Sequence, residues 1–471
     1  MGATVLLIVF WACSPPPLTH KRVNQTIPTS YMGIQDSSNT AKINWSAFFK
    51  DPHLTVLIDS ALANNQELNI MMLEIEMTKN EIQAKKGEYL PSVNIGGGMG
   101  VEKAARYTQI GASEATTEIK PGKEMPEPLG DFKVGLYARW EVDIWHKLRN
   151  AKQAAVNRYL ASIEGKNFMV TNLIAEIANS YYELIALDTQ LEILQKNIEI
   201  QSNALKMVRL QKDATRVTEL AVKRFEAQLL NTKNNQYKIQ QKIIETENQI
   251  NFLVGRFPQR IERSSDNFIT INLDKLHGGT PQELLQNRPD IRQAEQELAA
   301  AKLDIVAARA NFYPSLGLSA NVGIQAFNPA YLAKMPMSLF STLIGDMVGP
   351  LINKNAIKAT YLNANAKQVQ AIYDYQRTVL SAYIEVANQI SKITNLENSY
   401  DLKSKEVDTL TESVTIANRL FGSARAEYTE VLLTQRDVIE ARFDLIETKM
   451  QQVDATIKTY KALGGGWNHT Q

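Results

Sequence analysis

The chain has 471 residues, and its 51 Lys and Arg nearly balance its 50 Asp and Glu, which leaves a formal net charge of +1. This balance excludes the broad positive surface that non-specific nucleic-acid binding needs. The single cysteine, Cys13, excludes an internal disulfide framework and any zinc site built on cysteines.

The N-terminus has the features of a secretory signal. Residues 4–12 form an uncharged apolar run that is too short to span a bilayer as a helix, and Cys13 follows it directly. A sole cysteine in this place predicts a lipoprotein: residues 1–12 are removed as a signal peptide, Cys13 is acylated with palmitate, and residues 13–50 form a lipidated linker. The alternative is an ordinary N-terminus with an incidental cysteine, because no Lys or Arg precedes the apolar run.

Further along the chain, the hydrophobic pattern takes a period of two. Apolar and polar residues alternate in three segments and less regularly in a fourth, so the expected strands are about 92–103, 131–144, 314–326 and 337–351. Each strand is long enough to cross a bilayer at a tilt, which takes about 9–11 residues. One apolar and one polar face suit lipid outside and water inside. A soluble sheet with one wet face has the same alternation and is the alternative.

The alternation also predicts which side chains share a face of the sheet. Those of the apolar face should contact lipid or the seam between subunits, and those of the polar face should line a lumen. The apolar set is Phe132, Val134, Leu136, Trp140, Leu316, Leu318 and Val322, and the polar set is Lys133, Arg139, Glu141 and Asn321.

Long tracts without helix-breaking residues follow each pair of strands. Proline is absent from 129–257 and from 351–471, and glycine is nearly absent from most of both stretches. In the first tract, apolar residues recur at steps of three and four, with one polar interruption at Asp188, which indicates a heptad seam. Lower helix propensity near 213–217 and 422–426 predicts that each tract is a hairpin of two antiparallel helices, each of about 40–65 residues.

The same order of elements occurs twice. Each half is expected to form a helix, two strands and two long helices, and matching segments are offset by 209 to 223 residues. The matched pairs include Asn64 and Asn287, Glu176 and Glu385, Glu219 and Glu430, and Gly255 and Gly464. Four strands cannot close a barrel, and lipid does not tolerate open edges, so a barrel requires an oligomer. Three copies would supply twelve strands.

The elements set the expected domain boundaries. They are 51–257 for the first repeat, with its helical hairpin at about 147–254; 258–280 for a connector; 281–467 for the second repeat, with its hairpin at about 354–463; and 468–471 for a tail.

Five short motifs carry a resemblance that covers nearly the whole chain. They are Trp45 with Phe48-Phe49, Asp51 and Leu54; Arg288-Pro289-Asp290-Ile291; Ala310-Asn311-Phe312-Tyr313-Pro314; Tyr428-Thr429-Glu430-Val431-Leu432 with Gln435-Arg436; and Ala462-Leu463-Gly464-Gly465-Gly466-Trp467. In this order and in a duplicated frame, the sequence resembles the TolC-type outer-membrane efflux proteins. It is most similar to their lipoprotein branch (OprM- and NodT-like), which serves tripartite RND pumps.

The resemblance implies a fold class and a function. The fold is mainly α with a membrane β-barrel contribution: a homotrimer with a 12-stranded barrel in the outer membrane and a long α-helical barrel in the periplasm. The function is passive transport from an inner-membrane RND-type pump and a periplasmic adaptor (membrane fusion) protein across the outer membrane. Outer-membrane lipid is a further partner, whereas no enzymatic activity, nucleic-acid partner, cofactor or metal is expected. The alternative is an elongated coiled-coil scaffold of the cell envelope without transport activity.

The turns of the two hairpins form the expected periplasmic end, because the other helix ends feed the strands. The resemblance implies that an acidic residue just after each turn lines a closed aperture, and the matching residues are Glu219 and Glu430. Arg216 and Arg425 are the nearby candidates for pairing with them. Leu433 occupies the place of a second aperture Asp, so its apolar packing is expected to contribute to closure. The alternative is a surface salt bridge that gates nothing.

Overall fold

A computed structural model describes most of the chain, as two compact units. The described residues are 15–22, 26–31, 43–263, 268–274, 276, 278–423 and 425–467. The first unit comprises Met1–Arg22, Glu76–Leu160 and Gln296–Tyr373, and the second comprises Val23–Ile75, Ala161–Glu295 and Asp374–Gln471. The predicted signal peptide and its lipid attachment site, Cys13, lie outside the described residues.

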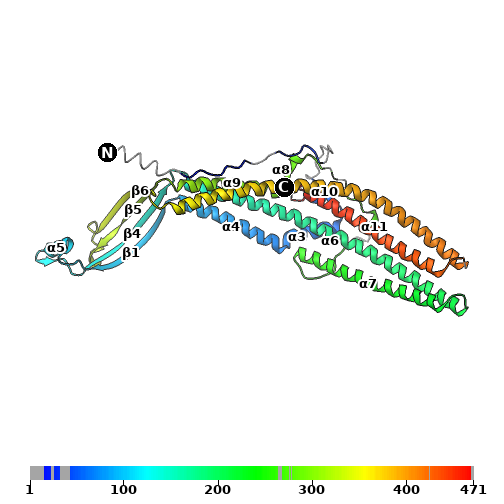
Figure 1. The fold of residues 1–471 in the computed structure, drawn as a ribbon. Helices are drawn as coiled ribbons and strands as arrows, with labels where there is room; N and C mark the ends of the chain where they lie inside the picture. The colour runs from blue at the N-terminus through cyan, green and yellow to red at the C-terminus, as the bar shows by residue number, and fades with distance from the viewer. Residues whose placement is uncertain are drawn as a thin grey trace. The chain divides into compact units, whose positions relative to one another are not determined.

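The first unit is built on an antiparallel sheet of four strands (Figure 1). The strands are β1 (Ser92–Glu102), β4 (Leu129–Val142), β5 (Ser315–Ala326) and β6 (Leu339–Val348), in the spatial order β1–β4–β5–β6. Strand β4 begins and ends two residues earlier than predicted. The earlier end follows from Asp143, whose carboxylate accepts hydrogen bonds from the backbone N–H groups of Leu148 and Arg149 and so caps the following helix.

The register places apolar side chains of neighbouring strands on one face of this sheet. Val134 lies opposite Ile324, and Trp140 lies opposite Leu318. Because side chains alternate along a strand, the predicted apolar set shares this face and the predicted polar set shares the other. The predicted division of these side chains between the two faces is confirmed.

The connection between β1 and β4 contains secondary structure that was not predicted. It contains α5 (Gln109–Thr116) and a small hairpin of β2 (Glu118–Lys120) and β3 (Lys123–Glu124). The side chain of Thr108 caps α5 by accepting a hydrogen bond from the N–H of Gly111. A Cβ on Gly111 would lie only 2.2 Å from a backbone oxygen, so the capped turn requires glycine.

The long helices follow the strands in each half of the chain. Besides α5, the described helices are α2 (Trp45–Phe48), α3 (Pro52–Asn64), α4 (Gln66–Tyr89), α6 (Lys147–Asp213), α7 (Glu219–Val254), α8 (Leu284–Asn287), α9 (Pro289–Ala310), α10 (Asn355–Gly422) and α11 (Tyr428–Ala462), with 3-10 turns η2 (Phe268–Thr270), η3 (Pro281–Glu283) and η4 (Pro329–Tyr331). This order confirms the duplicated unit of helix, strand, strand, helix, helix. No described helix has a stretch that is both long enough and apolar enough to cross a membrane.

The helical hairpins of the second unit have unequal arms. Helices α6 and α10 have 67 and 68 residues, whereas α7 and α11 have 36 and 35. The long arms slightly exceed the expected range of about 40–65 residues, and the short arms fall slightly below it. The long arms begin directly after strands, in the first unit, and the short arms stop earlier at glycines with left-handed backbone, Gly255 and Gly464.

The core of the second unit explains several of the recognised motifs. Phe48 and Phe49 are almost completely buried, and the Phe48 ring stacks on Tyr460 of α11 with 4.5 Å between ring centroids. The carboxylate of Asp51 caps α3 and also accepts a hydrogen bond from the hydroxyl of Tyr181 at 2.8 Å. These residues therefore hold α2 and α3 against the long helices.

The duplication is visible as two matching junctions in the second unit. In the first repeat, Nδ2 of Asn65 donates to the carbonyl oxygen of Leu253 at 2.8 Å. In the second repeat, Nη1 of Arg288 donates to the carbonyl oxygen of Ala462 at 2.8 Å. The donors are 223 residues apart and the acceptors 209, the same offsets that relate the two halves of the sequence.

Two glycines, Gly255 and Gly464, also occupy equivalent positions in the two junctions. The φ angle is +79° at Gly255 and +89° at Gly464, and L-residues with side chains rarely adopt such angles. A Cβ on Gly255 would lie 2.5 Å from the carbonyl oxygen of Asn64, and one on Gly464 would lie 2.5 Å from that of Asn287. The matched pairs that the sequence predicted thus make the same backbone contacts.

Candidate functional site

The sheet of the first unit presents two chemically different surfaces. On its polar face, Nδ2 of Asn321 donates to Oγ1 of Thr342 at 2.9 Å, and Nε2 of Gln325 donates to Oδ1 of Asp131 at 2.7 Å. These bonds connect polar side chains of neighbouring strands. The polar face is therefore a hydrogen-bonded lining of the kind that suits contact with water.

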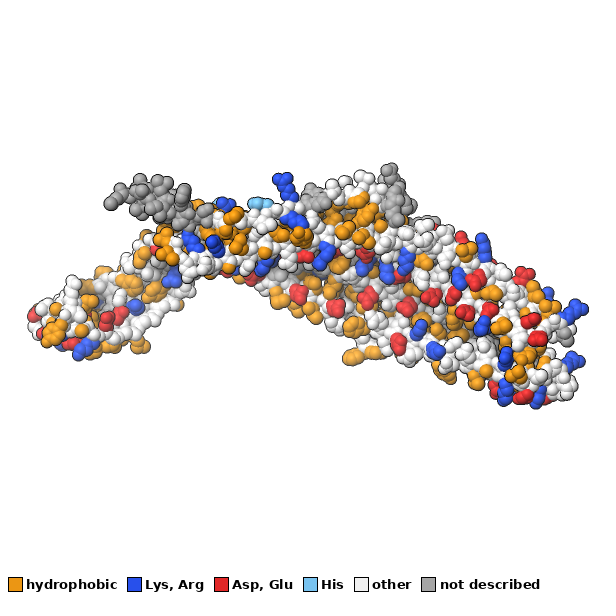
Figure 2. Space-filling model, in the orientation of Figure 1, with side chains coloured by type: hydrophobic (Ala, Val, Ile, Leu, Met, Phe, Trp, Pro, Cys, Tyr) orange, Lys and Arg blue, Asp and Glu red, His pale blue; other side chains and the backbone are white. Residues whose placement is uncertain are grey.

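The apolar face is uncovered in the single chain. Ile95 and Leu343 are each 79% exposed and Met99 is 85% exposed. Apolar side chains are visible at the surface of the strand region in Figure 2. A contiguous exposed apolar surface of this kind marks contact with a membrane or with another protein.

The first hairpin turn joins α6 to α7. The Thr218 side chain caps α7 by accepting a hydrogen bond from the N–H of Ala221. Glu219, a predicted aperture residue, forms an ion pair with Lys212 at 3.3 Å. Arg216, its predicted partner, is exposed and forms no ion pair with any described residue. The ion-pair partner of Glu219 is therefore Lys212 of α6, whereas the sequence suggested Arg216 of the turn.

The second hairpin turn joins α10 to α11. Its predicted residues, Arg425 and Glu430, are both exposed, and within the described chain neither forms an ion pair. The backbone N–H of Arg425 donates to the carbonyl oxygen of Leu420 at 2.9 Å and closes the end of α10. Glu430 lies in the first turn of α11, as Glu219 does in α7. Both carboxylates are therefore stabilised by a helix N-terminus.

An apolar cluster joins the two hairpins near their turns. Its buried residues come from α6 and α7 and are Leu205, Val208, Ala221, Val222, Phe225 and Leu229. Phe421, Tyr428 and Leu432 of the second hairpin pack against it. Leu433, the predicted closing residue, is 51% exposed in the single chain, so any further packing must involve another copy or a partner. This cluster was not predicted, although continuing the heptad seam to the turn would have indicated it.

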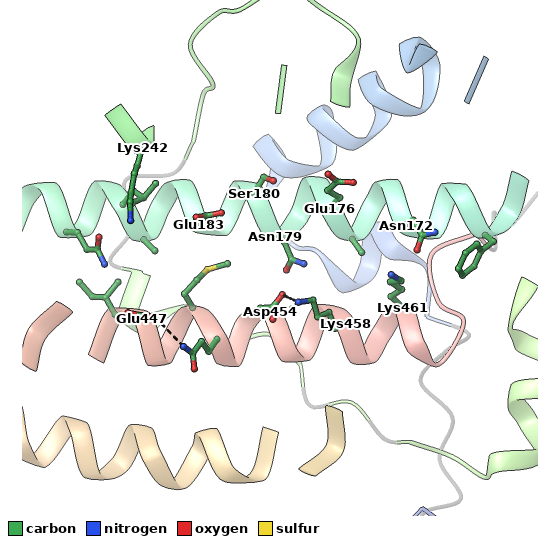
Figure 3. A pocket seen from close by; sticks show the side chains of 18 residues that line it. Asn172, Glu176, Asn179, Ser180, Glu183, Lys242, Glu447, Asp454, Lys458 and Lys461 are labelled. Carbon is green, nitrogen blue, oxygen red and sulfur yellow. Dashed lines mark hydrogen bonds and ion pairs between the residues drawn. The ribbon is translucent and has the colours of Figure 1, made fainter. Parts of the chain in front are cut away.

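A cavity of about 790 Å³ lies along α6 and α11 in the second unit (Figure 3). Glu176 and Glu183 of α6 and Asp454 and Lys461 of α11 line it, in each case seven residues apart. Lys458 forms an ion pair with Asp454 at 2.9 Å. The cavity is thus a mixed-charge groove beside the heptad seam. Among the described residues, no three His, Cys, Asp or Glu side chains could together hold a metal ion.

The polar interruption of the heptad seam has a partner from the connector. Both oxygens of Asp188 accept hydrogen bonds from Arg263, which also donates to Glu247 at 2.6 Å. Burial lowers the pKa of Arg263, but the hydrogen bonds and charges of the two carboxylates outweigh burial and raise the pKa above its ordinary value. This network ties the connector to α6 and α7 and is structural.

Comparisons with known proteins agree with this geometry. The model of the family described as Outer membrane efflux protein matches residues 57–256 and 280–465. The chain is 25% identical over 435 residues to the pyoverdine export outer membrane protein OpmQ of Pseudomonas aeruginosa. The alignment covers 92% of this chain and 89% of OpmQ. The chain is also 25% identical over 446 residues to the cation efflux system protein CusC of Escherichia coli, covering 94% and 93%.

A solved structure supports the fold. The chain superposes on the open state of the MtrE outer membrane channel of Neisseria gonorrhoeae with a TM-score of 0.83. The sequences are 22% identical, and the alignment covers 96% of this chain and 99% of the other. The fold is therefore shared over nearly the full length of both chains.

Proposed function

The chain belongs to the outer membrane efflux protein family, and we propose that it is the passive outer-membrane channel of a tripartite efflux system. Three copies form the conduit, a periplasmic adaptor protein connects it to an inner-membrane RND-type pump, and the pump supplies the energy. Its relatives are named for pyoverdine export and for cation efflux. The choice of cargo in this proposal therefore lies with the pump rather than with the channel.

The one-sided sheet is the observation that carries the proposal. Its apolar face suits lipid and its polar face suits a water-filled lumen. Strands β1 and β6 are the edges of the described sheet, and lipid does not tolerate unpaired backbone groups. Edge-to-edge pairing of three sheets gives twelve strands and removes every edge. A coiled-coil scaffold has no use for an uncovered apolar face, which disfavours the alternative.

A pair of arginine substitutions tests this assignment of faces. Leu318→Arg places a charge on the apolar face and should destabilise the membrane-inserted protein by about 2–4 kcal/mol if the site is near the bilayer midplane. Asn321→Arg, three residues away on the polar face, should be tolerated. Insertion is measured as heat-resistant oligomer in outer-membrane fractions. Equal damage from both substitutions would indicate a soluble sheet with two packed faces.

We further propose that Cys13 carries acyl chains that enter the same membrane as the strands. Leu18 packs in the apolar cluster of Tyr361, and Nζ of Lys21 lies 3.2 Å from the centroid of the Tyr373 ring. Followed toward the N-terminus, the chain thus runs toward the beginning of α10, where the strands end. Five residues span at most about 17 Å, so this course supports an anchor near the strands.

Metabolic labelling tests the anchor. Wild-type protein should incorporate an alkyne analogue of palmitate, and Cys13→Ala should abolish the incorporation. Ser14→Ala is the matched control, since it alters the neighbouring position without removing the thiol. Undiminished labelling of Cys13→Ala would contradict the proposal.

We also propose that the hairpin turns form the resting aperture, lined by Glu219, Glu430 and Leu433, with Arg216 and Arg425 beside them. Three copies bring six carboxylates around one axis, which favours cations in the pore. Their common position in the first turn of a helix supports the assignment. The exposure of Leu433 also fits packing against a neighbouring copy.

Planar-bilayer recordings test the aperture. Leu433→Ala and Arg425→Ala should conduct more than wild type, and Glu430→Gln should reduce the preference for cations. Glu412→Gln, which removes an exposed carboxylate of α10 away from the turns, is the control. If conductance and selectivity are unchanged in all of these variants, the constriction lies elsewhere.

A further inference from the structure

Basic residues are concentrated where the strands of the first unit meet its helices. The ten residues that flank each strand on the helix side (82–91, 143–152, 305–314 and 349–358) hold eight Lys or Arg and two Asp or Glu. We call these basic residues the basic collar; they are Lys85, Lys86, Lys147, Arg149, Lys152, Arg309, Lys354 and Lys358. The whole chain has a net charge of only +1, so the collar is a local excess.

The opposite ends of the strands lack this excess. The two loops there, 103–128 and 327–338, contain five basic and four acidic residues. Their charges pair with each other: Arg106 contacts both Glu124 and Glu127, at 3.6 and 3.4 Å. The positive charge is thus confined to one end of the sheet.

Half of the basic collar is free for an external anion. Within the described chain, Lys86, Lys152, Arg309 and Lys358 have no carboxylate within 4 Å, and three of them are exposed. The two acidic residues of the four flanking segments are already engaged. One of them, Glu88, pairs with Lys85 at 2.8 Å. The other one, Asp143, is a buried helix cap.

Aromatic side chains accompany the basic collar. Trp145 and Tyr313 stack with 4.8 Å between ring centroids, and the indole N–H of Trp145 donates to the carbonyl oxygen of Pro314 at 2.7 Å. Trp145 remains 45% exposed, and Ile352, a residue of another collar segment, is 90% exposed. Tryptophan and tyrosine with one apolar and one polar side favour the interface between lipid tails and head groups.

We propose that the basic collar binds anionic phospholipid head groups of the membrane leaflet on the helix side of the strands. The inference rests on the proposed function, because it requires that the apolar face of the sheet lies in lipid. The collar segments adjoin all four strands at the same end of the sheet, so the phosphates of lipids that cover the apolar face lie near them. Lys and Arg next to a membrane surface attract anionic lipids, and the aromatic pair fixes the depth.

A lipid competition experiment tests the proposal. The protein is reconstituted in nanodiscs of equal phosphatidylglycerol and phosphatidylcholine, transferred to detergent, and its retained lipids are counted by native mass spectrometry. Wild type should retain at least about fivefold more phosphatidylglycerol, the factor expected for a single cation beside an anionic lipid. The enrichment should decrease with salt concentration.

Matched variants assign the effect to the collar. Lys86→Gln/Arg309→Gln/Lys358→Gln should bring the two lipids close to equal retention. Lys103→Gln/Lys123→Gln/Lys334→Gln, which removes the same charge at the opposite end, should retain the wild-type preference. Equal retention by wild type, or equal loss in both variants, would overturn the inference.

The same preparations separate the inference from the proposed function. If wild type conducts in planar bilayers but shows no preference for phosphatidylglycerol, the inference about the basic collar is overturned and the proposed function is not. Failure of wild type to insert and conduct overturns the proposed function and the basic collar together.

Discussion

The two junctions of the second unit share their backbone contacts and differ in their side chains. At each junction, a glycine with positive φ packs on an asparagine carbonyl, and the next residue donates a hydrogen bond to the chain that leaves the hairpin. In the first repeat the donor is Asn65, a neutral amide. In the second repeat the donor is Arg288, which also pairs with Asp290 at 2.7 Å and with Glu385 at 2.8 Å.

The difference shows what duplication preserves. Glu176, the counterpart of Glu385, is exposed and accepts a hydrogen bond from Nε2 of Gln249 at 3.1 Å. Close backbone approach leaves no room for a side chain, so both copies keep the glycine. The donor needs only to reach a carbonyl oxygen, so an amide and a guanidinium can both make this hydrogen bond. The buried guanidinium also requires carboxylate partners for its charge.

Removing Arg288 should have the largest effect. Arg288→Ala leaves two partly buried carboxylates and the Ala462 carbonyl without their donor, and we expect a loss of about 3–5 kcal/mol in the free energy of unfolding. Thermal unfolding in detergent, followed by circular dichroism, measures it. The control is Arg377→Ala, since Arg377 forms an exposed pair within its own helix and should contribute less than about 0.5 kcal/mol. Similar losses for both variants would contradict the assignment.

The glycines should come next, with similar losses in both repeats. Gly255→Ala and Gly464→Ala impose a side chain on a left-handed backbone and against a carbonyl oxygen, so each should destabilise by about 2 kcal/mol or more. Gly422→Ala, which meets open space at the end of α10, should be neutral or slightly stabilising. The same thermal assay decides. Tolerance of alanine at one junction alone would show that the backbone contacts are not equivalent.

Loss of the neutral donor should be milder than loss of the charged one. Asn65→Ala removes the hydrogen bond to Leu253 and the cap that Asn65 provides to the N–H of Leu68. We expect a loss of about 1–3 kcal/mol in the same assay. A larger loss than for Arg288→Ala would reverse the proposed ranking of the junctions.

The smallest effects should come from the matched glutamates. Glu385→Gln weakens the network of Arg288 and should destabilise by about 1 kcal/mol. Glu176→Gln, at the equivalent place in the first repeat, should change stability by less than about 0.5 kcal/mol, because its contact is exposed. A chemical unfolding curve measures both. Equal effects would mean that the second junction is no more ionic than the first.

Much of the fold followed from patterns within short stretches of sequence. The alternation from Phe132 to Val142 predicted a strand and its two faces, and the tract without proline before Pro258 predicted the first hairpin. The lengths of the arms could be estimated only as about 40–65 residues, because heptad spacing indicates that a helix continues but not where tertiary packing stops it. The β1–β4 connection was missed because its helix of eight residues depends on one cap at Thr108.

The candidate aperture was predicted only in part. Glu219 and Glu430 could be placed after the turns, and both lie in the first turn of a helix. The partner of Glu219 could not be inferred, since Lys212 and Arg216 are both near it in sequence. The choice depends on how the last turn of α6 faces α7, which only the folded hairpin defines.

The sequence by itself determined the elements, their faces and their duplication, because backbone geometry converts a residue pattern directly into a helical or extended surface. Tertiary structure alone decided which charges meet. Asp188 interrupts an apolar seam, and its partner Arg263 is 75 residues away. Arg288 meets Glu385 across 97 residues. Such pairs form only after helices pack side by side, and one buried contact leaves no periodic signal in the chain.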